Sequence, residues 1–182
     1  MDEIQLALDK LDNLEGLDTV KKFVHDLTAQ VRVHKLRKER GLPMPQMTYH
    51  MAFGGTSQTE TIAGIIGDIL HALGALSVGH LVTVNKEDLV SEYIGQTTVK
   101  TREIVELAMG GVLLINDAHT FSVNSSCCNN DFEVLDTLHV AMVEHQDNLV
   151  VIFAGEKEKL TDFLNAHPGI ATKVPTRIDF DD

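Results

Sequence analysis

A short polar segment separates an expected strand that ends at Phe53 from an expected helix whose N-cap is Thr59. Its residues read Gly54-Gly-Thr-Ser-Gln-Thr-Glu-Thr61. A phosphate-binding loop at such a position reads G-x-x-x-x-G-K-[ST]. Its glycines let backbone N–H groups wrap the phosphates, its lysine neutralises their charge, and its hydroxyl holds magnesium. The position of the segment therefore indicates a nucleotide site, and its residues decide how well that site works.

Counted from Gly54, with Gly55 next, the last three positions hold Thr59, Glu60 and Thr61 instead of glycine, lysine and serine or threonine. Thr59 places a β-branched side chain where the backbone has to bend, and Glu60 reverses the charge beside the phosphates. Thr61 keeps the hydroxyl. The helix dipole still attracts an anion, but only by about 0.3–1 kcal/mol, which a neighbouring carboxylate cancels. We expect no cofactor and at most weak binding of ATP with magnesium. An ordinary strand-to-helix turn fits the same residues.

A second candidate site follows the apolar run 112–115, which ends in Asn116 and Asp117. In nucleotide hydrolases of this layout, the strand ends in an Asp that positions magnesium and a Glu that activates water. Asn116 carries no charge for a metal, and Asp117 is one methylene shorter than glutamate. A displacement of about 1 Å can cost on the order of a hundredfold in rate. We therefore expect no intact catalytic pair. Asp117 as a surviving metal ligand stays open, as does a plain Asn-Asp turn.

The two cysteines, Cys127 and Cys128, are adjacent and can pair with each other only with strain. They predict a reducing compartment such as the cytoplasm. A metal site with His119 or His139 would have a spacing that matches no known zinc pattern, so we expect no metal. The net charge of −12 disfavours nucleic acid as a partner. The Met-Asp-Glu start predicts no signal peptide, and no apolar run reaches the ~20 residues of a membrane span, so we expect no membrane partner.

The elements that position these residues can be predicted from periodicity and from Gly and Pro punctuation. The predicted helices cover 1–12, 18–40, 59–73, 88–93, 98–109, 131–145 and 157–166. The predicted strands cover 47–53, 80–84, 112–115, 149–154 and 177–180. Continuous apolar strands that alternate with helices are typical of a parallel sheet between two helical layers. We expect a single domain over 1–182, with N-terminal helices in 1–45 and the core in 46–182. Ligands of such folds bind at the carboxyl ends of the strands, where both motifs lie.

Seven ordered segments carry a family resemblance: 14–21 (LEGLDTVK), 50–53 (HMAF), 79–84 (GHLVTV), 88–97 (DLVSEYIGQT), 108–115 (AMGGVLLI), 149–155 (LVVIFAG) and 167–169 (HPG). Together they resemble the ATPase core of the CbbX / stage V sporulation protein K group of AAA+ proteins, also called CfxQ-like. The resemblance implies a P-loop NTPase-like three-layer α/β sandwich with a parallel sheet of order 5-1-4-3-2. It also implies assembly into a ring. The helical lid of the family would follow Asp182 and is absent, which predicts either a trimmed chain or one domain of a longer protein.

The resemblance also assigns two further sets of positions. Tyr93, Ile94 and Gly95 correspond to the pore loop that grips a threaded protein segment. The alternative for Tyr93 is a half-buried aromatic at a helix end. The two arginines that reach a neighbouring subunit's nucleotide in this family are replaced by Ala171 and Lys173. The phosphate loop also looks about two residues short.

Several parts of one mechanism are thus altered together, which favours a degenerate AAA+ module, a pseudo-ATPase. It would act by protein–protein interaction, as a scaffold, a regulatory ring subunit or one domain of a tandem AAA+ protein. Its expected partner is a protein or the other subunits of an AAA+ ring. The alternative is an AAA+ ATPase with residual ATP binding and hydrolysis that drives protein remodelling. Thr61 and Asp117 would then hold magnesium, with a lysine from elsewhere, such as Lys173. A third hypothesis is an unrelated metal site on Asp117, His119 and the two cysteines.

Overall fold

A computed structural model describes residues 2–43, 48–55, 57–93, 95–121 and 130–180 of the chain. Its centre is one five-stranded sheet in which all paired neighbours run parallel, in the order β2-β3-β4-β1-β5. The strands are β1 (Met51–Gly54), β2 (Leu81–Val84), β3 (Val112–Ile115), β4 (Val150–Gly155) and β5 (Thr176–Asp179). This order is the predicted 5-1-4-3-2, and it confirms the P-loop-type α/β fold.

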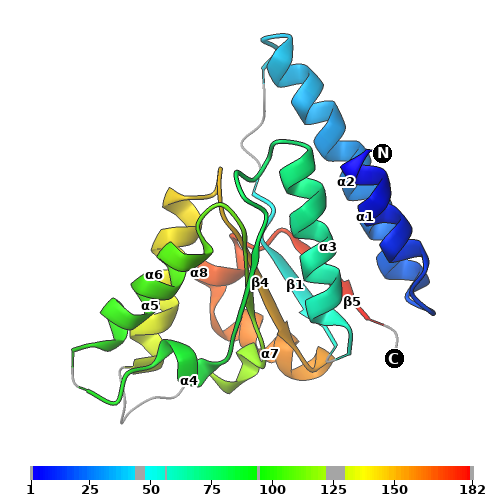
Figure 1. The fold of residues 1–182 in the computed structure, drawn as a ribbon. Coiled ribbons are helices and arrows are strands. Elements are labelled where there is room, and N and C mark those ends of the chain that lie inside the picture. Colours follow the sequence, from blue (N-terminus) through cyan, green and yellow to red (C-terminus); the bar gives the residue numbers. More distant parts are fainter. Residues whose placement is uncertain (1, 44–47, 56, 94, 122–129, 181–182) are drawn as a thin grey trace.

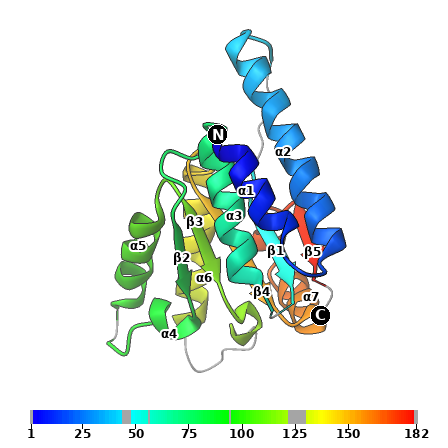
Figure 2. The same cartoon turned by 45° about the vertical axis from the view of Figure 1, so that its right-hand side comes forward.

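Helices cover both faces of the sheet, as Figures 1 and 2 show. The helical elements are α1 (Glu3–Asp12), α2 (Asp18–Glu39), α3 (Thr59–Ala72), α4 (Lys86–Leu89), α5 (Thr97–Ala108), the 3-10 turn η1 (Ala118–Thr120), α6 (Asn130–Glu144), α7 (Lys157–Ala166) and α8 (Pro168–Ala171). One buried cluster joins one face of the sheet to α1, α2 and α3, and the second joins the other face to α5, α6 and α7.

Strand residues contribute alternately to these two clusters, as the two-residue period of a strand requires. In β1, Phe53 belongs to the first cluster and Ala52 to the second, and both are fully buried. Burial on both faces explains why the strands read as continuous apolar runs. The three-layer sandwich therefore follows from the hydrophobic pattern of the strands together with their parallel pairing.

Most predicted boundaries lie within two residues of the observed ones, and three further differences stand out. The first strand begins at Met51 rather than at 47, a residue that lies outside the described ranges. The short helix covers Lys86–Leu89 rather than 88–93, because Asn85 and Asp88 form a capping box that starts it earlier; the Asn85 N–H donates to Asp88 Oδ2 at 2.9 Å. Pro168, which was expected only to end a helix, begins α8 at the first helical position, where proline costs no hydrogen bond.

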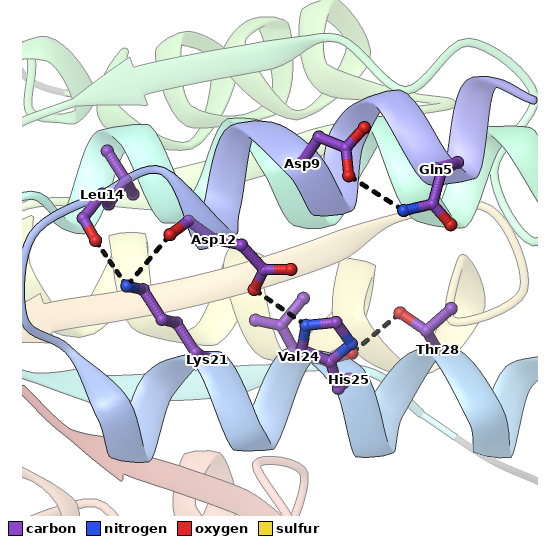
Figure 3. Close-up of polar contacts among 8 residues, drawn as sticks. All are labelled: Gln5, Asp9, Asp12, Leu14, Lys21, Val24, His25 and Thr28. Carbon is purple, nitrogen blue, oxygen red and sulfur yellow. Dashed lines mark hydrogen bonds and ion pairs between the residues drawn. The ribbon is translucent and has the colours of Figure 1, made fainter. Parts of the chain in front are cut away.

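The N-terminal hairpin of α1 and α2 is held by polar contacts at its closed end (Figure 3). The Lys21 ammonium donates to the carbonyl oxygen of Asp12 at 3.3 Å and to that of Leu14. His25 Nε2 lies 2.9 Å from Oδ1 of Asp12. Lysine is favourable here because the carbonyl groups at the C-terminal end of a helix lack intrahelical partners. The hairpin packs on α3, the helix that begins at the candidate phosphate loop.

Within the described ranges, the search for helices long and apolar enough to cross a bilayer finds none.

Candidate nucleotide-binding site

The two sequence motifs lie where the carboxyl ends of the strands meet, which is the lower edge of the sheet in Figure 1. The β1 strand ends at Gly54, which pairs with Gly155 at the end of β4, and Ile115 at the end of β3 pairs with Phe153. The Gly55 N–H donates to the carbonyl oxygen of Gly155 at 2.9 Å. The loop after β1 and the turn after β3 are therefore separated only by the end of β4, as ligand sites in parallel sheets require.

The two glycines that open the loop are needed by the neighbouring strand β5. A Cβ on Gly54 would collide with the Asp179 carboxylate, and a Cβ on Gly55 would lie 2.8 Å from Cβ of Phe180. The Phe180 N–H donates to the Gly54 carbonyl oxygen at 2.8 Å, and the Phe180 ring lies 5.0 Å from that of Phe53 between centroids. Packing against β5 is thus a second reason for glycine at these positions, beside the approach of a phosphate.

Helix α3 begins differently from the prediction. Thr59 was expected to be the N-cap, but the N-cap is Gln58, whose φ of 62° is left-handed and whose side chain makes no capping bond. Thr59 is the first helical residue, and it is only 5% exposed. The carboxylate of Glu60 and the hydroxyl of Thr61 follow on exposed positions of the first turn. Because the first N–H groups of a helix lack intrahelical acceptors, this turn presents donors and Thr61 together at the sheet edge.

The turn after β3 places Asp117 at the surface. Its φ of 50° is left-handed, and its carbonyl oxygen accepts from the Thr120 N–H at 2.9 Å and the Thr120 hydroxyl at 2.7 Å. Asn116 is half-buried, and its N–H donates to the Val84 carbonyl oxygen at 2.9 Å. The backbone of Asn116 and Asp117 is therefore held by hydrogen bonds, while the Asp117 carboxylate stays exposed at this edge of the sheet.

His119 lies against the end of β4, which the sequence analysis did not foresee. A Cβ on Gly155 would come 2.8 Å from His119 Nδ1, a buried atom with no hydrogen-bond partner among the described residues. The metal hypothesis had joined His119 to Asp117 and the cysteines. Cys127 and Cys128 lie outside the described residues, and within the described ranges no three His, Cys, Asp or Glu side chains are grouped as metal ligands.

The predicted pore-loop position lies on the turn between α4 and α5. Tyr93 is 77% exposed, which excludes the alternative of a half-buried aromatic. Its N–H donates to Ser91 Oγ at 3.1 Å, and Gly95 has a left-handed φ of 78°. Ile94 lies outside the described residues. The turn thus presents an aromatic side chain to solvent at the lower edge of the molecule.

Ala171 and Lys173 lie at the opposite edge of the sheet. The carbonyl oxygen of Lys173 accepts from Thr48 Oγ1 at 3.4 Å, and Thr48 precedes β1, whereas the phosphate loop follows it. Strands rise about 3.3 Å per residue, so β1 alone separates the two edges by roughly 10 Å. Lys173 is therefore unsuited to replace the missing lysine in the loop of its own chain.

His50, a fully buried residue, lies near this opposite edge. Burial lowers the pKa of His50 and the charge of Lys173 lowers it further, while the hydrogen bond to the Met142 carbonyl acts in the other direction. Nδ1 accepts from the Val151 N–H at 2.9 Å, so the proton is on Nε2, which lies 3.0 Å from the Met142 oxygen. This neutral imidazole joins α6 and β4 and takes no part in the candidate site.

The chain is similar along nearly its whole length to several known proteins. Protein CfxQ homolog of Guillardia theta is 40% identical over an alignment of 183 positions, which covers 99% of this chain and 62% of that protein. Ribulose bisphosphate carboxylase/oxygenase activase of Cyanidioschyzon merolae is 39% identical, with 99% of this chain and 62% of that protein covered. Protein CbxX of Cupriavidus necator is 38% identical, with 99% and 57% covered. No family model matches the chain.

The chain is a CfxQ/CbbX-like AAA+ protein. It spans about three-fifths of the length of these relatives, 62% for each of the first two. Both altered motifs and the exposed turn at Tyr93 lie inside the aligned region, because the alignment covers 99% of the chain.

The comparison corrects the main expectation about function. A pseudo-ATPase that acts only by protein binding was predicted from the altered motifs. That interpretation is wrong, because the chain aligns from end to end with AAA+ proteins, one of which is named an activase. The altered residues at Glu60, Asn116 and Asp117 are therefore features of an AAA+ module that spans part of its relatives' length.

Proposed function

We propose that this CfxQ/CbbX-like chain is the nucleotide-binding core of an AAA+ ATPase that uses ATP hydrolysis to remodel a protein substrate. The observation that carries the proposal is the 39% identity, over 99% of the chain, to a protein named as an activase. The proposal rests also on the layout of the sheet edge, where the phosphate loop and the turn after β3 flank the end of β4. ATP with magnesium would bind across this edge.

The types of residue at this edge are suitable for binding a complex of magnesium with a nucleotide. Magnesium prefers oxygen ligands, keeps several waters and takes only one or two groups from the protein besides phosphate oxygens. The Thr61 hydroxyl and the Asp117 carboxylate are both exposed at this edge and supply such oxygens. Magnesium would supply charge neutralisation on the phosphates. The amides of the loop and of the first turn of α3 would orient the phosphate chain.

The protein substrate would be contacted at the turn that carries Tyr93 and Gly95. The Tyr93 side chain is 77% exposed on a short, hydrogen-bonded turn, so its ring is available to contact a partner. We propose that this turn grips a segment of the substrate. Lys173 would act on the nucleotide of a neighbouring subunit in a ring, since it lies far from the loop of its own chain.

Titration calorimetry and phosphate release test the proposal. Thr61→Ala and Asp117→Ala should each lower the turnover of ATP by about tenfold or more while leaving the fold intact, because both side chains are exposed. Asp162→Ala, on an exposed position of α7, is the matched control and should leave turnover unchanged. An unaltered chain that binds no MgATP at millimolar concentration, or an Asp117→Ala variant with full turnover, would refute the proposal.

A further inference from the structure

We propose that Lys157 supplies the positive charge on the phosphates that Glu60 cannot supply. The inference rests on the proposed function, since it concerns the same nucleotide site. In the usual phosphate loop the lysine stands directly before the serine or threonine, and here that position holds a carboxylate. A site that binds a triphosphate needs a cation from another element, and the structure identifies one at the end of β4.

Lys157 is placed at the phosphate loop by the pairing of β1 with β4. It is the first residue of α7 and follows the last residue of β4 by two positions. A Cβ on Gly54 would lie 3.3 Å from Cγ of Lys157, so the aliphatic stem of the lysine lies against the last residue of β1. Its ammonium group lies three bonds beyond this point on an exposed side chain. The charge can therefore reach a ligand held by the loop.

Other cations at this edge are already engaged. Lys86 Nζ lies 2.8 Å from Asp131 Oδ2, and Lys159 Nζ lies 3.0 Å from Glu156 Oε1. Arg177 Nε donates to Asp179 Oδ1 at 3.1 Å, and its other nitrogens donate to Thr161 and to the Lys157 carbonyl oxygen. For the Lys157 ammonium, no carboxylate lies within ion-pair distance among the described residues. Among the described residues, Lys157 is thus a cation beside the candidate phosphate loop whose charge is not neutralised by a carboxylate.

The location of Lys157 on its helix also favours an anionic ligand. The N-terminal end of a helix carries a partial positive charge, so a lysine at the first helical position is unfavourable on its own. A phosphate bound between this end and the start of α3 would remove the repulsion. Gly54 contributes by leaving room, because a side chain there would displace the stem of Lys157 from the end of β1.

The test is the affinity of the purified chain for MgATP, MgADP and adenosine by titration calorimetry, with three variants. Lys157→Ala should weaken the binding of MgATP by about tenfold to a hundredfold, which is the loss of one charge-assisted hydrogen bond. Adenosine, which has no phosphate, should bind both forms equally. Lys157→Arg keeps the charge and should retain most of the affinity. Lys159→Ala is the control, because its partner is Glu156 and it should bind like the unaltered chain.

The outcomes separate this inference from the proposed function. A chain that binds no MgATP overturns both. A chain that binds MgATP with the same affinity after Lys157→Ala overturns the role of Lys157 alone and leaves the ATPase proposal standing. An equal loss for adenosine and MgATP would show that the substitution disturbs the structure rather than a phosphate contact, and it would also overturn the inference.

Discussion

Glu60 is the residue at which helix stability and phosphate binding oppose each other. Its carboxylate is exposed in the first turn of α3, where a negative charge stabilises the helix but repels phosphate. We expect Glu60→Gln to raise the affinity for MgATP several-fold and to lower the free energy of unfolding by about 0.3–1 kcal/mol. Calorimetry and urea denaturation measure the two effects. Asp68→Asn, on an exposed position later in α3, is the control. Equal affinities for Glu60→Gln and the unaltered chain would contradict the repulsion.

His50 makes the stability of the fold depend on pH. Its pKa is lowered in the folded chain by burial, then by the charge of Lys173, whereas an unfolded chain has a histidine pKa near 6.5. Below pH ~6.5 the His50 side chain therefore binds a proton in the unfolded chain more readily than in the folded chain. The free energy of unfolding should fall as the pH drops, by up to about 1.4 kcal/mol per pH unit for this group.

Urea denaturation at several pH values between 7.5 and 5.5 checks this expectation. His50→Gln keeps a donor for the Met142 carbonyl but cannot titrate, so its stability should change less with pH than that of the unaltered chain. If His50→Gln and the unaltered chain lose stability in parallel, the assignment to His50 is wrong.

At the scale of elements, the α1–α2 hairpin depends on Lys21. Its ammonium satisfies two carbonyl oxygens at the end of α1, those of Asp12 and Leu14. Lys21→Met keeps the aliphatic stem and removes these contacts, which should cost about 1 kcal/mol of the free energy of unfolding. Lys22→Met changes an exposed neighbour and should cost little. Urea denaturation compares the two, and equal losses would show that the capping contacts add nothing.

The strands could be predicted where an apolar run and the residues that bound it are adjacent in the sequence. The run 112–115 has the bounds observed for β3, since glycines precede it and a polar Asn-Asp turn follows. The start of α4 was missed because the capping box of Asn85 and Asp88 outweighs hydrophobic spacing in a helix of four residues. Thr59 was misplaced because a left-handed Gln58, which propensity does not favour, ends the loop.

Only part of the candidate site could be predicted from the sequence. The loop 54–61 and Asp117 could be found because motifs are continuous in the chain. Lys157 and His119 could not, since their closeness to Gly54 and Gly155 arises from tertiary packing. Lys157 lies about a hundred residues from the loop, and only the pairing of β1 with β4 brings them together. The available signal was a lysine two residues after a buried strand, at the end of the sheet where ligands bind.

At the scale of the whole molecule, the residues with proposed roles are divided between the two edges of the sheet at which the strands begin and end. The edge at the carboxyl ends holds the phosphate loop, Asp117 and Lys157, and the turn at Tyr93 lies on the same side. The other edge holds Lys173 and the buried His50. This division suits a head-to-tail arrangement of copies, in which one edge meets the next subunit's nucleotide.

The contact between Phe180 and the loop after β1 links the last strand to the proposed nucleotide site. The Phe180 N–H is bonded to the Gly54 carbonyl oxygen, and its ring packs on Phe53. The loop also lies close to Phe180 at Gly55, where an added Cβ would come 2.8 Å from Cβ of Phe180. In the proposed nucleotide-bound state, a shift of the loop would therefore reach Phe180 at the end of β5 through a single backbone hydrogen bond. The last strand would then respond to whether a triphosphate or a diphosphate is bound.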